Sequence, residues 1–184
     1  MKRLICTSFC VLFCCNVLHA QDVPNFPKPQ KEHEWLKQFA GDWETDSKAI
    51  AGPDMPAFEC KGTISSRMLG GFWVVNELNT DIGEMKISGV QTIGYDAQKE
   101  KYVGTWVDSV MDYMWKYEGD VDETGKILTL EAEGPNMMAA GETAMFRDVY
   151  EFKSKDQIVM KSQMQGEDGA WVTFMEGTAK RKKK

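Results

Sequence analysis

The sequence predicts an all-β fold, an antiparallel up-and-down barrel of about ten strands with a short N-terminal helix. Three observations favour this fold class. Apolar and polar residues alternate along most of the chain after Gly41, as in strands that bury one face. Short turn sequences rich in Gly, Asp and Ser separate the alternating segments, which favours hairpins between successive strands. Helix-length patterns do not recur between the strands, so a parallel sheet is not expected.

The first 20 residues have the order of a secretory signal peptide. Lys2 and Arg3 form a positive region, residues 4–18 are mostly apolar, and Ala20 is the small residue before a cleavage point. The apolar run is about 15 residues long, and a membrane helix needs roughly 20. We therefore expect an exported protein, periplasmic or extracellular, with an uncleaved membrane anchor as the alternative. A lipoprotein is disfavoured because bulky residues precede the cysteines of this segment.

Cysteine and charge limit what the exported part can do. Removal of residues 1–20 leaves Cys60 as the remaining one of five cysteines, so no intramolecular disulfide is expected and the core must hold the fold. Loss of Lys2 and Arg3 also takes the net charge from −6 to −8, and five of the remaining basic residues lie at 180–184. A body this acidic repels phosphate backbones, so no nucleic-acid partner is expected. The basic tail is either solvated or in weak contact with an anionic surface.

The chain is expected to fold as one domain behind a linker. Three prolines before residue 30 predict an extended linker. Trp35, Leu36 and Phe39 then share one face of a helix over 31–40, which Gly41 ends. The predicted units are a signal peptide at 1–20, a Pro-rich linker at 21–32, the β-barrel domain at 33–180 and the basic tail at 181–184.

The strands expected from the alternation are 42–49, 58–68, 72–81, 90–95, 101–108, 114–121, 126–133, 143–152, 157–165 and 170–180. A set of short strands joined in sequence forms either a closed barrel or a sandwich. Closure is favoured because it removes the edge strands that would otherwise invite aggregation. We expect the N-terminal helix to plug one end of the barrel.

Several motifs then follow in order along the chain. They are Gly41-x-Trp43, Leu69-Gly70-Gly71-Phe72, Gly94-Tyr95-Asp96, Lys101-Tyr102, Trp106-x-Asp108-Ser109, Gly119-x-x-Asp122-x-x-Gly125-Lys126, and Arg147. The first resembles the opening of calycin barrels, the lipocalins and their relatives. Together, over about residues 35–181, they are similar to a bacterial family of unknown function. The resemblance implies a calycin-like barrel and brings no established activity or catalytic residues. It also implies that a basic residue after the last strand, here Arg181, stacks on Trp43.

The scarcity of histidine excludes most common catalytic and metal plans. His19 leaves with the signal peptide, and His33 stands before the first strand. Ser-His-Asp and Cys-His catalysis therefore lack a base, and zinc or non-haem iron sites lack ligands. Haem-binding barrels with an axial histidine on a late strand are excluded in the same way, while a methionine or tyrosine ligand stays open. Methionine groups such as Met160 and Met164 are interpreted as core or cavity lining rather than as a Cu(I) site. No cofactor, metal site or catalytic residue is predicted.

Aromatic residues indicate where a ligand would bind. Tyr102 and Trp106 alternate onto one face of a strand, and Trp115 and Tyr117 onto one face of the next. Arg147 is the polar anchor that we expect if its face, shared with Met145 and Val149, points inward. A buried guanidinium needs a carboxylate, which Asp108 or the ligand would supply. The alternative is an Arg147 that faces solvent. The candidate ligand-binding residues are therefore Tyr102, Trp106, Trp115, Tyr117 and Arg147.

The sequence leaves three functions open. The first is an exported binding or accessory module for a small apolar or amphipathic ligand. The second is a filled barrel that acts as an envelope interaction module, whose mark would be an exposed apolar patch in place of a cavity. The third is a hydrolase or isomerase with a carboxylate pair or a Tyr-Arg site in the barrel mouth, whose mark would be a pocketed ionisable cluster with shifted pKa values.

Overall fold

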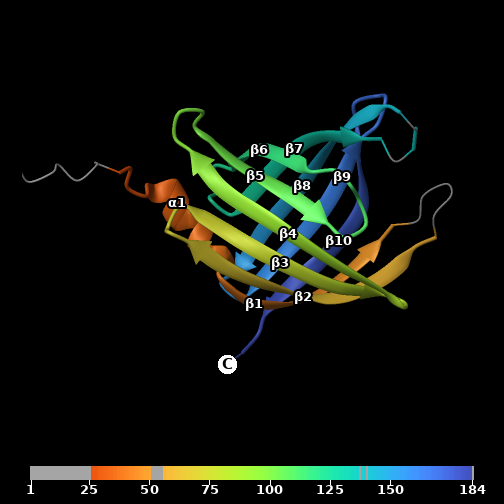
Figure 1. The fold of residues 1–184 in the computed structure, drawn as a ribbon, viewed down its shortest axis with the longest axis horizontal. Coiled ribbons are helices and arrows are strands. Elements are labelled where there is room, and N and C mark those ends of the chain that lie inside the picture. Colours follow the sequence, from red (N-terminus) through yellow and green to blue (C-terminus); the bar gives the residue numbers. More distant parts are fainter. Residues whose placement is uncertain (1–25, 51–55, 137, 140, 184) are drawn as a thin grey trace, which may run out of the picture.

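The computed structural model describes residues 26–50, 56–136, 138–139 and 141–183. The expected signal peptide, the first residues of the linker and the last lysine lie outside these ranges. Ten antiparallel strands close into one barrel, with β1 paired to both β2 and β10 (Figure 1). The elements are α1 (Lys31–Trp35), a 3-10 turn η1 (Leu36–Phe39), β1 (Gly41–Ala49), β2 (Phe58–Leu69), β3 (Trp73–Ile82), β4 (Met85–Asp96), β5 (Lys101–Asp108), β6 (Trp115–Val121), β7 (Ile127–Pro135), β8 (Thr143–Ser154), β9 (Gln157–Gln165) and β10 (Trp171–Arg181).

The predicted fold class is confirmed, and most strand boundaries differ from those expected by at most two residues. Three differences are more informative. The helix expected over 31–40 is one α-helical turn followed by a 3-10 turn. β4 begins at Met85 rather than at residue 90, because Gly83, with φ +61°, makes a tight turn after β3. β10 continues through Arg181, so the expected basic tail begins inside the last strand. Within the described ranges, no helix has the length and hydropathy that a membrane span requires.

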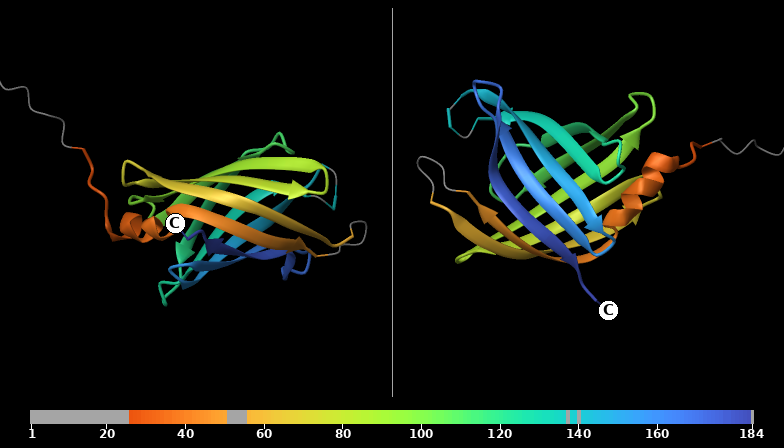
Figure 2. Two further views of the ribbon diagram at one scale, coloured as in Figure 1. Left: turned by 90° about the horizontal axis from the view of Figure 1, so that it is seen from below. Right: turned by 180° about the vertical axis from the view of Figure 1, so that it is seen from behind.

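The N-terminal helix closes one end of the barrel, as expected (Figure 2). Leu36 and Phe39 are buried, and the ring of Phe39 packs edge-on against the ring of Phe152. The indole Nε1 of Trp43 donates a 2.7 Å hydrogen bond to the carbonyl of Phe39. This end is therefore a packed aromatic plug rather than an opening.

Arg181, the last residue of β10, holds the helical plug against this strand. Its guanidinium lies 4.0 Å from the ring centroid of Trp43, which confirms the expected stacking. The same guanidinium donates to the carbonyls of Ala40 at 2.5 Å and Gln38 at 2.9 Å. Gly41 has φ +130°, and a side chain there would collide with Arg181. The contact between Trp43 and Arg181 thus adds to the pairing of the first and last strands and also holds the helix.

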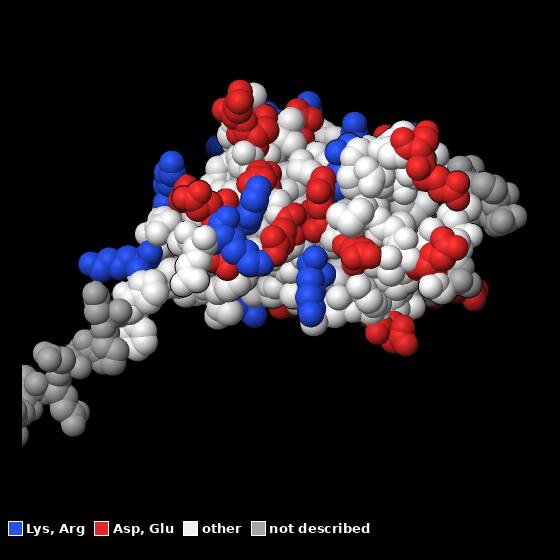
Figure 3. All heavy atoms as spheres, turned by 90° about the horizontal axis from the view of Figure 1, so that it is seen from above, with Lys and Arg blue, Asp and Glu red and all other residues white. Residues whose placement is uncertain are grey.

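Charged side chains are scattered over the outside of the barrel. Basic and acidic side chains are interspersed on the face drawn in Figure 3. Several pair across neighbouring strands, such as Lys101 with Asp120 at 2.5 Å, and Lys48 with Glu176 at 2.9 Å. Exposed pairs of this kind contribute little to stability. The stability of the barrel must come mainly from its interior.

Candidate functional site

The interior of the barrel contains a cavity of about 480 Å³. This volume lies within the roughly 300–1,000 Å³ of typical ligand pockets. Phe39 and Trp43 form its floor above the helical plug, and residues of every strand except β7 contribute to its walls. Apolar side chains make up most of the lining, among them Ile64, Leu78 and Met160.

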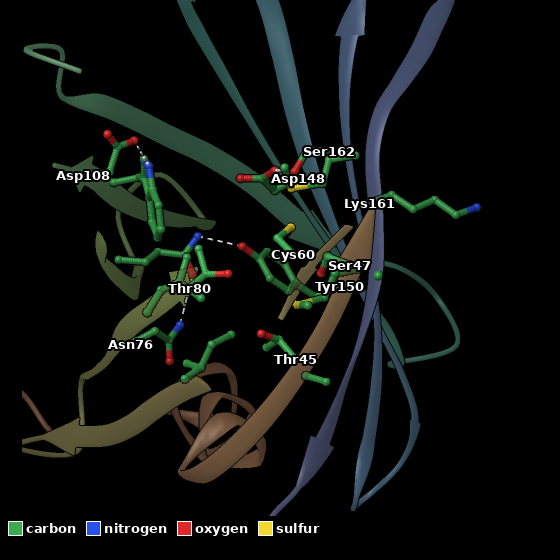
Figure 4. A pocket seen from close by; sticks show the side chains of 18 of the residues that line it. Thr45, Ser47, Cys60, Asn76, Thr80, Asp108, Asp148, Tyr150, Lys161 and Ser162 are labelled. Carbon is green, nitrogen blue, oxygen red and sulfur yellow. Dashed lines mark hydrogen bonds between the residues drawn. The ribbon is translucent and has the colours of Figure 1, made fainter. Parts of the chain in front are cut away.

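A partly buried carboxylate, that of Asp148, lies in the cavity wall. Phe146, Asp148 and Tyr150 alternate on the inner face of β8 and line the cavity together. The hydroxyl of Tyr117, on β6, donates a 2.6 Å hydrogen bond to Oδ2 of Asp148. The hydroxyl of Ser162, on β9, donates a 2.6 Å hydrogen bond to Oδ1. Figure 4 shows Asp148 and Ser162 side by side in the wall.

The electrostatics of this group are unusual for a carboxyl. Burial raises the pKa of Asp148, while the hydrogen bonds from Ser162 and Tyr117 act in the opposite direction. Burial, followed by the charge of Asp148, raises the pKa of Tyr117. Among the described residues, no lysine or arginine forms an ion pair with Asp148. The carboxyl is therefore held by neutral hydroxyls alone.

A chain of amides and a phenol crosses the cavity beside this carboxyl. Asn76 Nδ2 donates to Gln91 Oε1 at 3.0 Å, and Gln91 Nε2 donates to the Tyr150 hydroxyl at 2.8 Å (Figure 4). Burial raises the pKa of Tyr150, and the nearby Asp148 raises it further. Ser66 Oγ and Asn76 Oδ1, at paired positions of β2 and β3, are buried without a hydrogen-bond partner. Unpaired buried polar atoms are costly, so this wall suits a bound water or a ligand group.

Asp108 and Trp106 shape the wall near the end of β5. Trp106 Nε1 donates to Asp108 Oδ2 at 2.9 Å, and the backbone amides of Val110 and Met111 donate to Oδ1 at 2.8 and 3.0 Å. The ring of Trp106 lies against Gly89, where any side chain would collide with it. Asp108 thus fixes the following turn and the indole, and it is not the partner that the sequence suggested for Arg147.

Four of the five predicted ligand-binding residues, Trp106, Trp115, Tyr117 and Arg147, belong to the cavity wall. Tyr102 lies at the closed end instead. Its ring packs against the ring of Trp35, and its hydroxyl donates to the carbonyl of Glu32 at 3.3 Å. Tyr102 therefore belongs to the plug.

Arg147 belongs to the cavity wall, but its guanidinium is on the outer face. It stacks over Trp171 at 4.2 Å, and its Nε donates to Gln163 Oε1 at 2.6 Å. Neither partner lines the cavity. Of the two alternatives for Arg147, the structure has the outward one, because strand alternation gives the inner position to the next residue, Asp148.

Sequence reasoning missed the polar side chains of the cavity. Asp148, Tyr150, Gln91, Asn76 and Ser162 were not among the candidates. A signal for two of them was present, because Phe146 and Phe152 share the strand face of Asp148 and Tyr150. Among the described residues, no group of three His, Cys, Asp or Glu side chains could hold a metal ion.

Comparisons with known proteins place this barrel in a family. A family model described as "Protein of unknown function (DUF1579)" matches residues 28–181. The chain belongs to this family. A search of the curated proteins found no match.

Solved structures show the same architecture at low identity. The crystal structure of Rv2717c from M. tuberculosis is 13% identical, with a TM-score of 0.64 over 85% of this chain and 100% of that one. The S-type phycobiliprotein lyase CPES from Guillardia theta is 15% identical, with a TM-score of 0.55 over 85% of this chain and 99% of that one. At such identities the similarity supports the fold alone.

Proposed function

We propose that this protein is an exported binding module that holds a small, largely apolar ligand inside its barrel. The observation that carries the proposal is the cavity of about 480 Å³, where a filled barrel would have packed side chains. The proposal is therefore preferred over a filled barrel that acts only through its surface. The similarity to a phycobiliprotein lyase agrees with ligand binding but contributes nothing on the ligand.

The lining suits a ligand with an apolar body and a polar group. Ile64, Leu78 and Phe146 offer apolar contact, and Met160 can adjust to an irregular shape. The polar side chains gather at Asp148 and along the Asn76–Gln91–Tyr150 chain, so a ligand can be oriented by a few hydrogen bonds.

A second candidate is an enzyme that transfers a proton. The buried Asp148 beside Tyr117, with both pKa values raised, is the kind of cluster that this alternative requires. Binding is preferred because the mostly apolar cavity is sufficient for it, whereas proton transfer also needs a substrate group placed against Asp148. An enzyme would chemically change the ligand that it captures, whereas a binding module would release it unchanged.

A titration with the neutral fluorescent probe N-phenylnaphthylamine tests whether the cavity binds. Leu78→Trp places an indole in the cavity, and Val107→Trp places the same group on the exposed outer face of β5 as a control. We expect one probe to bind per chain in the wild type and the control, and the affinity of Leu78→Trp to fall at least about tenfold. Equal binding by all three proteins would locate the probe outside the cavity and count against the proposal.

Export rests on the order of the first 20 residues and has its own test. The intact mass of the protein recovered from the envelope and the medium of expressing cells should correspond to cleavage after Ala20. An uncleaved mass in the membrane fraction would support the anchor instead.

A further inference from the structure

We propose that the cavity selects amphipathic ligands that carry a positively charged amine, with the carboxylate of Asp148 as the anchor for the ammonium group. This inference rests on the proposed binding function and names the class of ligand.

The charges that point into the cavity are negative. Two basic residues belong to its wall, Arg147 and Lys161, and both direct their charge outward. Arg147 stacks on Trp171, and the exposed Lys161 extends away from the other labelled side chains in Figure 4. Glu176 also belongs to the wall, but its carboxylate forms an exposed ion pair with Lys48 at 2.9 Å. Among the described lining residues, Asp108 and Asp148 are left as the charged groups on the inner side of the wall.

The carboxylate of Asp148 is held in place but can still accept hydrogen bonds from a ligand. Tyr117 and Ser162 each donate one hydrogen bond to a different carboxylate oxygen, so each oxygen keeps a free acceptor position. Asp148 is half-buried by area although it lies deep within the barrel, so its accessible part faces the cavity. An ammonium group offers three donors and a compensating charge, which matches an oriented carboxylate that lacks a cation.

The surroundings of Asp148 also favour a cation. The rings of Tyr117, Tyr150 and Trp115 line the same cavity, and aromatic faces attract cations. A ligand carboxylate would meet Asp108 and Asp148 with no inward-facing basic side chain of the described wall to neutralise it. The cavity therefore disfavours the binding of anionic ligands and favours that of cationic ones.

The test compares three probes that differ only in their polar end: octylamine, octanol and octanoic acid. Each is titrated into the full chain as isolated from expressing cells, and binding is measured by calorimetry. We expect octylamine to bind at least about tenfold more tightly than octanoic acid, with octanol between them. In Asp148→Asn the affinity for octylamine should fall to that for octanol, while octanol binding stays unchanged. The control Asp81→Asn removes the same charge from an exposed position on β3 and should keep the wild-type order.

A pH series on the wild type gives a second test that needs no variant. Tyr117 from β6 and Ser162 from β9 bond to Asp148, Tyr150 from β8 lies near it, and Asp108 from β5 acts on its partner Tyr117. Of these four residues, Asp108 is the one that carries another carboxyl group. The ratio of octylamine to octanol affinity should rise with pH as the carboxyl of Asp148 ionises. A flat ratio, a preference for octanoic acid, or an amine preference that survives in Asp148→Asn would overturn the inference while leaving the cavity binder intact. Failure of octanol itself to bind would overturn both.

Discussion

The hydroxyl of Tyr117 donates a 2.6 Å hydrogen bond to Oδ2 of Asp148, in the wall of the barrel cavity. The two residues come from β6 and β8, separated by β7 in the barrel. The bond therefore bridges the inner face of β7 rather than joining two directly paired strands. It combines a costly buried acid with the means to hold that acid in one orientation, which is typical of a functional site.

Replacement of Asp148 by asparagine should stabilise the ligand-free protein more at neutral pH than in mild acid. Burial raises the folded-state pKa of Asp148, so the native protein holds a proton that the unfolded chain has already lost. That contribution is complete below the ordinary carboxyl range and is lost as the pH rises through the raised folded pKa. We expect the difference in unfolding free energy between Asp148→Asn and wild type to grow from mild acid to neutral pH. Urea unfolding at both pH values measures it, and a pH-independent difference would contradict the burial of an uncompensated charge.

Loss of the Tyr117 hydroxyl should destabilise the fold. Tyr117→Phe removes one of the two hydrogen bonds to a buried carboxyl, and we expect a cost of about 1–3 kcal/mol in unfolding free energy. Tyr113→Phe is the matched control, because its hydroxyl donates to the carbonyl of Glu133 at an exposed position. The two variants should separate clearly in thermal unfolding. Similar losses of stability in both variants would mean that the Tyr117–Asp148 hydrogen bond contributes no more than an exposed one.

Arg181 should be the most sensitive charged position at the closed end. Arg181→Ala loses the stacking on Trp43 and the bonds to the carbonyls of Ala40 and Gln38, and we expect a loss of about 2–4 kcal/mol. Arg181→Lys should recover only part, because an ammonium cannot reproduce the planar fork. Lys182→Ala, next along the chain, should be nearly neutral. Full recovery by lysine would show that charge alone matters there.

Position 134 should not tolerate a side chain larger than that of glycine. A side chain at this position of β7 would collide with the ring of Trp115, which lines the cavity. We expect Gly134→Ala to cost about 1–3 kcal/mol and to change the near-ultraviolet circular dichroism of the protein. Gly166→Ala in the β9–β10 turn, where the added carbon meets only the end of the Asp168 side chain and a carbonyl at 3.6 Å, is the control. An unchanged aromatic signal in Gly134→Ala would show that Trp115 is free to move.

Much of the fold could be predicted from local patterns. Alternation and turn residues located the strands, and the Gly41-x-Trp43 motif led to the contact between Trp43 and Arg181. The face of β8 could not be assigned as readily, because Arg147 and Asp148 are adjacent charges of opposite sign within an apolar segment. Which of the two side chains points inward depends on the register of β8 with β7 and β9, which is a long-range property.

The cavity itself was beyond prediction for a related reason. Large residues such as Trp106 and Trp115 would fill a barrel if their rings pointed to its axis. They lie instead against Gly89 and Gly134, which leaves space at the centre. Sequence separates each of these pairs by many residues, so only the closed barrel shows that the rings lie flat against the wall.

Native mass spectrometry of the protein recovered from the exported fraction of expressing cells tests the central claim most directly. We expect a reproducible added mass, of a small molecule with a basic nitrogen, that survives desalting and is lost on denaturation. The same added mass should be absent from Leu78→Trp and present in Val107→Trp. A clean ligand-free mass for the wild type, together with no binding of N-phenylnaphthylamine, would contradict a ligand-holding barrel.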